Sequence, residues 1–117
     1  MKSGSFRARL GYALAGIRIA WRREKSFRTQ VAMAFGAAAV TAAVRPGLVW
    51  AALVALSMGL VLALEMANAA LEYLVDKVHP GIAEEIKFAK DAAAGAVLLA
   101  SIAAAAVGVM MLVSTLR

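Results

Sequence analysis

Three long apolar stretches constrain this chain more than any other feature of its sequence. Residues 48–64 contain no charge and a single serine, and residues 92–113 contain no charge at all. A shorter stretch, residues 31–44, reaches spanning length if it is extended back to Phe27 and Arg28 snorkels towards water. A helix needs about 20 mostly apolar residues to cross a bilayer. The three stretches therefore predict three transmembrane helices.

The overall composition supports lipid as the solvent. Of the 117 residues, 63% are hydrophobic and 17% are charged, and the mean hydropathy is +0.79. A water-soluble domain of this length could not bury so much apolar surface. We therefore expect one all-α, membrane-embedded domain over residues 1–117, with spans at about 27–44, 48–78 and 92–113.

Proline and glycine predict where the spans end. Residues 45–47 read Arg-Pro-Gly and residues 79–81 read His-Pro-Gly. Proline cannot continue a helix and glycine permits a tight turn, so both tripeptides predict turns. The charged residues 82–91 predict a short helix plus loop before the last span.

Residues 6–23 predict an amphipathic helix at the membrane surface. Apolar side chains recur at helical spacing at Phe6, Leu10, Leu14, Ile17 and Trp21, and arginines occupy another face. Such a helix lies in the interface with its arginines towards anionic head groups. A soluble basic helix that binds a partner is the alternative. A signal peptide is not expected, because Arg18 breaks the apolar stretch.

Basic residues predict the topology. The net charge is +6, and residues 1–28 hold eight basic side chains against one acid, Glu24. These eight are Lys2, Arg7, Arg9, Arg18, Arg22, Arg23, Lys25 and Arg28. Together with a predicted loop at 76–91, they are expected on the cytoplasmic side of the membrane, with Arg45 and Arg117 opposite. Because the remaining chain is apolar, the basic arm favours an anionic membrane over nucleic acid.

A polar stripe interrupts the second span near its end. Its members are three, four and four residues apart, so they share one face of a helix: Glu65, Asn68, Glu72 and Asp76. Three carboxylates on one face repel one another unless a cation or protonation intervenes. Charged groups this close to a membrane indicate function. A solvated helix end that protrudes from the membrane is the alternative interpretation.

Other residue types limit the chemistry available. The chain has no cysteine and a single histidine, so thiolate and multi-histidine metal sites are excluded within one chain. Any metal would need carboxylates, which suit Mg²⁺. No GxxxxGK[ST] motif or other soluble nucleotide-binding motif is present. Lys90, Asp91 and Glu24 could add to a site for phosphoryl transfer, or could be ordinary interfacial charges.

Three motifs resemble those of the prokaryotic diacylglycerol kinase family, over residues 11–108. They read GYALAGIRIAWRREKSFR (11–28), EMANAALEYLVD (65–76) and AKDAAAGAV (89–97). The resemblance implies three transmembrane helices and a surface helix, assembled as a homotrimer. It further implies active sites near the cytoplasmic interface, shared between neighbouring subunits, that use ATP and a membrane lipid.

The same resemblance implies roles for individual residues. Glu65 is similar to a catalytic base or acceptor-positioning carboxylate, and Asn68 to a residue that orders the site. Metal ligands, acting through Mg²⁺ bound to ATP, are implied at Glu24 and Glu72. Nucleotide-binding residues are implied at Tyr12, Asp76, Lys90 and Asp91. Residues on the lipid side are implied at Arg18, Trp21, Ser26, Phe27, Arg28 and Ala94.

The resemblance leaves the lipid open. Ala69 stands where many relatives carry Ser or Thr, and Ala94 stands where the diacylglycerol kinase branch has a serine. The AAAGAV ending of the third motif and the His79-Pro80 pair resemble the undecaprenol kinase branch. The segment AWRREKSFRTQ resembles the diacylglycerol branch at least as well, so phosphatidic acid is the expected product and undecaprenyl phosphate the alternative. A non-enzymatic membrane scaffold and a small transporter or channel are the competing functions.

Overall fold

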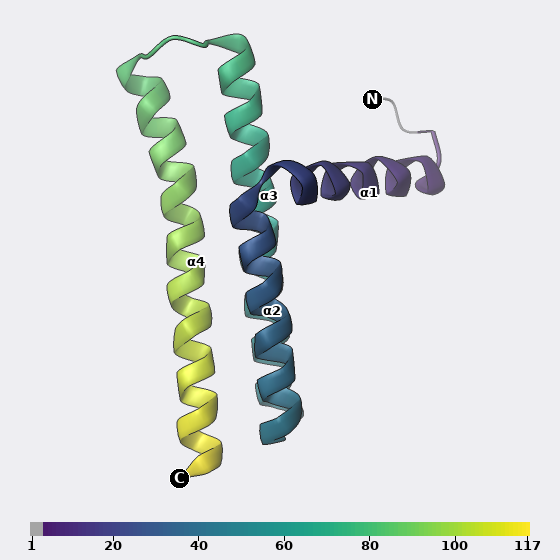
Figure 1. Ribbon diagram of the computed structural model, residues 1–117, viewed down its shortest axis with the longest axis vertical. Helices are drawn as coiled ribbons and strands as arrows, with labels where there is room; N and C mark the ends of the chain where they lie inside the picture. Colours follow the sequence, from purple (N-terminus) through teal and green to yellow (C-terminus); the bar gives the residue numbers. More distant parts are fainter. Residues whose placement is uncertain (1–3) are drawn as a thin grey trace.

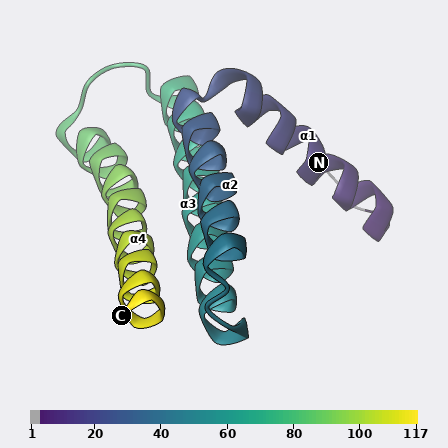
Figure 2. The same ribbon diagram turned by 60° about the horizontal axis from the view of Figure 1, so that its bottom comes forward.

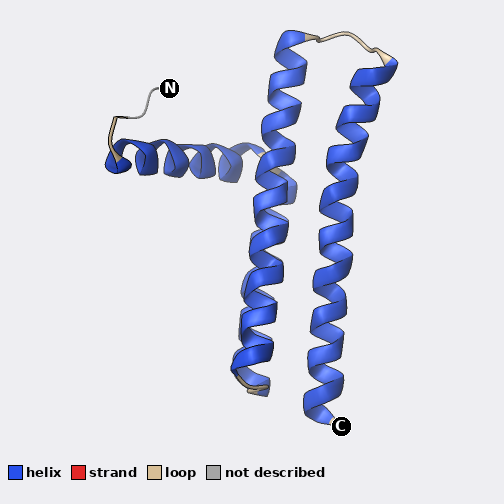
Figure 3. Cartoon of the chain, turned by 180° about the vertical axis from the view of Figure 1, so that it is seen from behind, coloured by secondary structure: helices blue, strands red, loops and turns tan. Residues whose placement is uncertain are grey.

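The computed structural model describes residues 4–117, so Lys2 of the basic arm lies outside the described residues. Within them the chain is helical, with short connections (Figures 1 and 3). The helices in chain order are α1 (Phe6–Arg23), α2 (Lys25–Val44), α3 (Leu48–Val78) and α4 (Glu84–Leu116). The long helices α2, α3 and α4 run along one axis, and α1 projects to one side of it (Figure 1).

Helix α1 is held at both ends by side chains. The Ser5 hydroxyl accepts a hydrogen bond from the Ala8 amide at 3.2 Å, which satisfies a free donor of the first turn. At the other end, Glu24 adopts an extended conformation and separates α1 from α2. Arg28 then donates from Nη1 to the carbonyl oxygens of Trp21 at 2.7 Å and Arg22 at 3.2 Å. The corner between α1 and α2 is therefore fixed by α2 itself.

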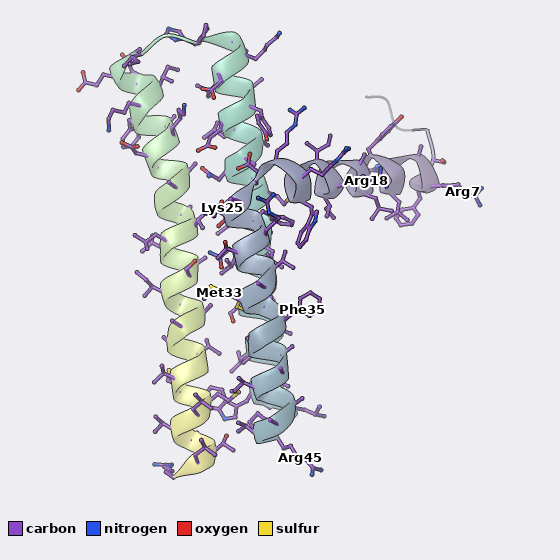
Figure 4. All side chains as sticks on the ribbon, viewed as in Figure 1. Arg7, Arg18, Lys25, Met33, Phe35 and Arg45 are labelled. Carbon is purple, nitrogen blue, oxygen red and sulfur yellow. The ribbon has the colours of Figure 1, made fainter. Side chains whose placement is uncertain are left out.

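Helix α2 matches the thickness of a bilayer. Its 20 residues make a helix about 30 Å long, which is the thickness of the hydrocarbon core. Figure 4 shows Lys25 at the corner with α1 and Arg45 at the opposite end, with Phe35 projecting from the helix between them. Arg45 ends α2 in a left-handed conformation with φ of 56°, and Gly47 follows with φ of 103°. Lys25 and Arg28 at one end and Arg45 at the other thus bracket an uncharged stretch, residues 29–44.

Helices α3 and α4 are longer than the membrane requires. With 31 and 33 residues, they extend for about 46 Å and 50 Å. Both continue past α1 (Figure 1). We name the part that contains residues 65–91 and the α1–α2 corner the charged end of the bundle. The part around residues 41–58 and 104–117 is the apolar end.

The predicted loop at 76–91 was wrong in extent. Residues 76–78 belong to α3, and α4 begins at Glu84, so the connection is residues 79–83. The charged residues 84–91 continue as helix into the apolar stretch because no proline or glycine interrupts them. Glu84 and Glu85 also lie in the first turn of α4, where negative charge stabilises the helix dipole.

Few side chains are buried within the single chain. Helix α3 packs against both α4 and α2, and Figure 2 shows α2 alongside α3. The buried apolar side chains are Ala20, Phe27, Val54, Val61, Ala69, Ala100 and Met111. Large apolar side chains are exposed along all three long helices, which are long and apolar enough to cross a membrane. The predicted all-α membrane fold, with three spans and an N-terminal helix, is confirmed.

Candidate active site

The polar stripe runs from the interior of the bundle to its surface. Glu65 is 6% exposed and is the buried charged residue of the described part of the chain. Asn68 and Glu72 are half-buried, and the Asp76 side chain is 62% exposed. Counted from Leu48, about 20 residues of α3 fill the hydrocarbon core. Glu65 therefore lies close to the membrane boundary, and Asp76 lies beyond it.

Glu65 is bonded to the first turn of α2. The Ser26 hydroxyl donates to Oε1 of Glu65 at 3.1 Å. One turn further along α3, Oδ1 of Asn68 is buried and has no hydrogen-bond partner among the described residues. An unsatisfied buried acceptor costs about 1–3 kcal/mol. The carboxylate and the amide therefore form a polar group that can accept a donor from a bound molecule.

A second polar group joins α3 to α4 at the surface. Nζ of Lys90 lies 2.9 Å from Oδ1 of Asp76, and the Glu72 carboxylate is near enough to attract the same ammonium. On α4 itself, Lys87 pairs with Asp91 at 2.6 Å, and both side chains are exposed. The structure thus brings Glu72, Asp76 and Lys90 together, while Asp91 is engaged by a residue of its own helix.

Glu24 lies at the α1–α2 corner against α3. Its carboxylate lies beside the Tyr73 hydroxyl, with the Arg23 guanidinium nearby. Tyr73 follows Glu72 directly in α3, so the corner places Glu24 next to the turn that carries Glu72. Tyr73 is not among the site residues that the sequence predicts. Its contact with Glu24 depends on where the chain turns, and no local pattern signals it.

The carboxylates suit a metal that arrives with its own ligands. Among the described residues no three histidine or carboxylate groups are placed to hold an ion by themselves. Mg²⁺ is usually bound through one or two carboxylates together with waters and substrate phosphates. Glu24 and Glu72 fit that role for a magnesium–nucleotide complex, since each offers a carboxylate near the exposed charged end.

The residues expected on the lipid side do not form a single surface. Phe27 is 6% exposed, so its ring packs inside the chain. Trp21 and Arg28 are joined through the Trp21 carbonyl oxygen at the α1–α2 corner. Arg18 is exposed on α1 (Figure 4), and Ala94 is exposed on α4. Tyr12, expected to bind nucleotide, is 46% exposed on α1, the helix that projects to one side of the bundle (Figure 1).

Comparison with known proteins identifies the family. A family model described as prokaryotic diacylglycerol kinase matches residues 11–112. A protein named diacylglycerol kinase, from Synechocystis sp., is 44% identical over 108 residues. The match covers 90% of this chain, and the chain spans 61% of the length of that relative. The chain therefore belongs to the prokaryotic diacylglycerol kinase family.

Proposed function

We propose that this chain is an ATP-dependent lipid kinase that transfers the γ-phosphate of Mg-ATP to the hydroxyl of diacylglycerol, giving phosphatidic acid. The observation that supports it most strongly is the buried carboxylate of Glu65 at the membrane boundary, one end of a stripe that reaches the surface at Asp76, which pairs with Lys90. A lipid hydroxyl arrives from the bilayer and a nucleotide from water, and the stripe joins the two environments.

Glu65 is proposed to bind the lipid hydroxyl and to accept its proton. In the reaction the hydroxyl oxygen forms a bond to the γ-phosphorus while the bond between that phosphorus and the bridging oxygen breaks. ADP leaves with the electrons of the broken bond, and the hydroxyl proton passes to the Glu65 carboxylate. A positioned base of this kind contributes about 10²- to 10⁴-fold in rate. Asn68 is proposed to order the site, because its buried Oδ1 has no partner among the described residues and can accept a hydrogen bond from a bound molecule.

The phosphates are proposed to bind at the surface end of the stripe. Lys90 pairs with Asp76 and is attracted by Glu72, and its ammonium is flexible enough to exchange Asp76 for a phosphate oxygen. Tyr12 and Asp91 are proposed to complete the nucleotide site. Magnesium bound to ATP would be held by Glu24 and Glu72, where it would neutralise phosphate charge.

The site is proposed to be completed by assembly into a homotrimer in the bacterial inner membrane, with the N-terminus and the 79–83 connection in the cytoplasm. Tyr12 lies on α1, which leads away from the bundle (Figure 1). In the proposed trimer, Tyr12 would therefore contact a nucleotide bound to a neighbouring subunit. The many exposed apolar side chains of the long helices provide surface for such contacts. Arg18, Trp21 and Ala94 are then available to lipid.

Undecaprenol is the second candidate substrate, favoured by Ala94 and by the His79-Pro80 pair. The test offers diacylglycerol and undecaprenol separately in mixed micelles with γ-labelled Mg-ATP and identifies the labelled lipid. Phosphatidic acid as the main product is the expected result. Undecaprenyl phosphate as the main product would move the chain to the other branch. No labelled lipid from folded protein with either alcohol would overturn the kinase proposal.

A further inference from the structure

Ser26 is held in a fixed place at the start of α2. Its neighbour Phe27 is buried against the bundle, and its other neighbour in this turn, Arg28, is bonded to two carbonyl oxygens of α1. The Ser26 hydroxyl is therefore presented by an anchored backbone. It donates to Oε1 of Glu65 across 39 positions of sequence, from one helix to another.

We infer that Ser26 is a positioning residue for Glu65, and not a contact to the lipid. This inference rests on the proposed function of Glu65. By fixing Oε1, the Ser26 hydroxyl directs Oε2 towards the lipid hydroxyl and holds the carboxylate in one rotamer. A hydroxyl has one proton to donate, and in Ser26 that proton is committed to Glu65.

The arrangement matters because glutamate is a flexible side chain. Free rotation spreads a carboxylate over several rotamers, and burial alone does not select one of them. A hydrogen bond to a charged oxygen is stronger than one between neutral groups, so a single well-placed donor can select the productive rotamer. Misplacing a reacting group by about 1 Å can lower a rate by about a hundredfold.

The first test separates the rate constant from lipid affinity. We expect Ser26→Ala to lower kcat by about tenfold with little change in the KM for diacylglycerol, and Ser26→Thr to restore most of the loss. In the Glu65→Gln background, Ser26→Ala should cause no further loss. Ser57→Ala is the matched control: it removes a hydroxyl that bonds to Val54 within α3, away from the site.

A raised KM with unchanged kcat would overturn the inference and make Ser26 a lipid contact. An equal loss in the presence and absence of the Glu65 carboxylate would also overturn it, because Ser26 would then act independently of Glu65.

The second test does not depend on turnover. The infrared band of the Glu65 carboxyl group is identified as the band lost in Glu65→Gln. Ser26→Ala should shift this band, while Ser57→Ala should leave it in place. If Ser26→Ala shifts the band but the parent protein has no kinase activity, the Ser26–Glu65 contact stands and the proposed function is rejected. An unshifted band in active protein would reject the positioning role and retain the function.

Discussion

The two ends of the bundle use their polar side chains differently. At the charged end, Ser26 bonds to Glu65 and Lys90 bonds to Asp76, so each contact joins two helices. At the apolar end, Ser57 donates to Val54 O at 3.0 Å and Thr41 to Ala37 O at 2.7 Å, each within one helix. A longer contact from Thr41 to the Met111 sulfur, at 3.7 Å, is weak.

This difference distinguishes the polar side chains proposed to act in the reaction from those that only satisfy their own helix. A hydroxyl group that donates to a carbonyl oxygen of its own helix is satisfied inside lipid and needs no partner from a neighbouring helix. Carboxylates shared between helices are costly there, and they are retained where they act on a substrate. Substitution of Glu65, Ser26 or Lys90 should therefore change turnover, and substitution of Ser57 or Thr41 should not.

The largest effect is expected from Glu65→Gln. The change keeps the shape of the side chain and removes the proposed proton acceptor, so kcat should fall by at least about a hundredfold. The measurement is lipid phosphorylation in mixed micelles, with circular dichroism to show that the variant remains helical. A folded Glu65→Gln protein with an undiminished rate would contradict the role assigned to this end.

Lys90→Gln should give the next largest effect. Loss of the ammonium beside Glu72 and Asp76 should lower kcat/KM for Mg-ATP by about a hundredfold. Lys87→Gln is the matched control one turn away, because Lys87 forms an exposed pair within α4. Exposed pairs contribute little, so this variant should remain within about twofold of the parent. Equal losses in both variants would show that the charged end attracts ATP only through its total charge.

A moderate effect on stability is expected from Arg28→Met. The variant removes the two hydrogen bonds that hold the last turn of α1, at a cost of about 1 kcal/mol. Unfolding by SDS in mixed micelles, followed by circular dichroism, measures it. Arg22→Met is the control, since Arg22 contributes its backbone carbonyl and not its guanidinium to this contact. Equal destabilisation by both variants would mean that lost positive charge, and not the lost contact, is responsible.

The smallest effects are expected at the apolar end. Ser57→Ala and Thr41→Val remove hydroxyl groups that bond to their own helices, so stability should change by less than about 0.6 kcal/mol. The lipid phosphorylation rate should remain within about twofold, because neither side chain lies in the polar stripe. A large loss of rate in either variant would remove the distinction between the two ends.

The sequence was sufficient for much of the fold. Apolar length predicted three spans, and the Arg-Pro-Gly and His-Pro-Gly turns correspond to the ends of α2 and α3. The charged residues 82–91 predict a short helix plus loop before the last span, whereas α4 begins at Glu84 and is continuous. Charge opposes membrane insertion but does not oppose helix formation, so a helix can begin in water and continue into lipid.

The candidate site was less accessible to sequence reasoning. Helical spacing placed Glu65, Asn68, Glu72 and Asp76 on one face, because that requires only the period of α3. The contacts from Ser26 to Glu65 and from Glu24 to Tyr73 depend on the corner between α1 and α2. The direction of that corner follows from Glu24 breaking the helix and from Arg28 bonding to α1, which are long-range consequences and not periodic signals.

The central claim is that the charged end couples a nucleotide in water to a hydroxyl in the membrane. The most direct measurement compares the amount of ATP consumed with the amount of phosphorylated lipid formed, in vesicles with and without diacylglycerol. The proposed mechanism predicts equal amounts of both with the lipid present and almost no ATP consumption without it. ATP hydrolysis that continues without the lipid, or without labelled lipid as product, would contradict the claim.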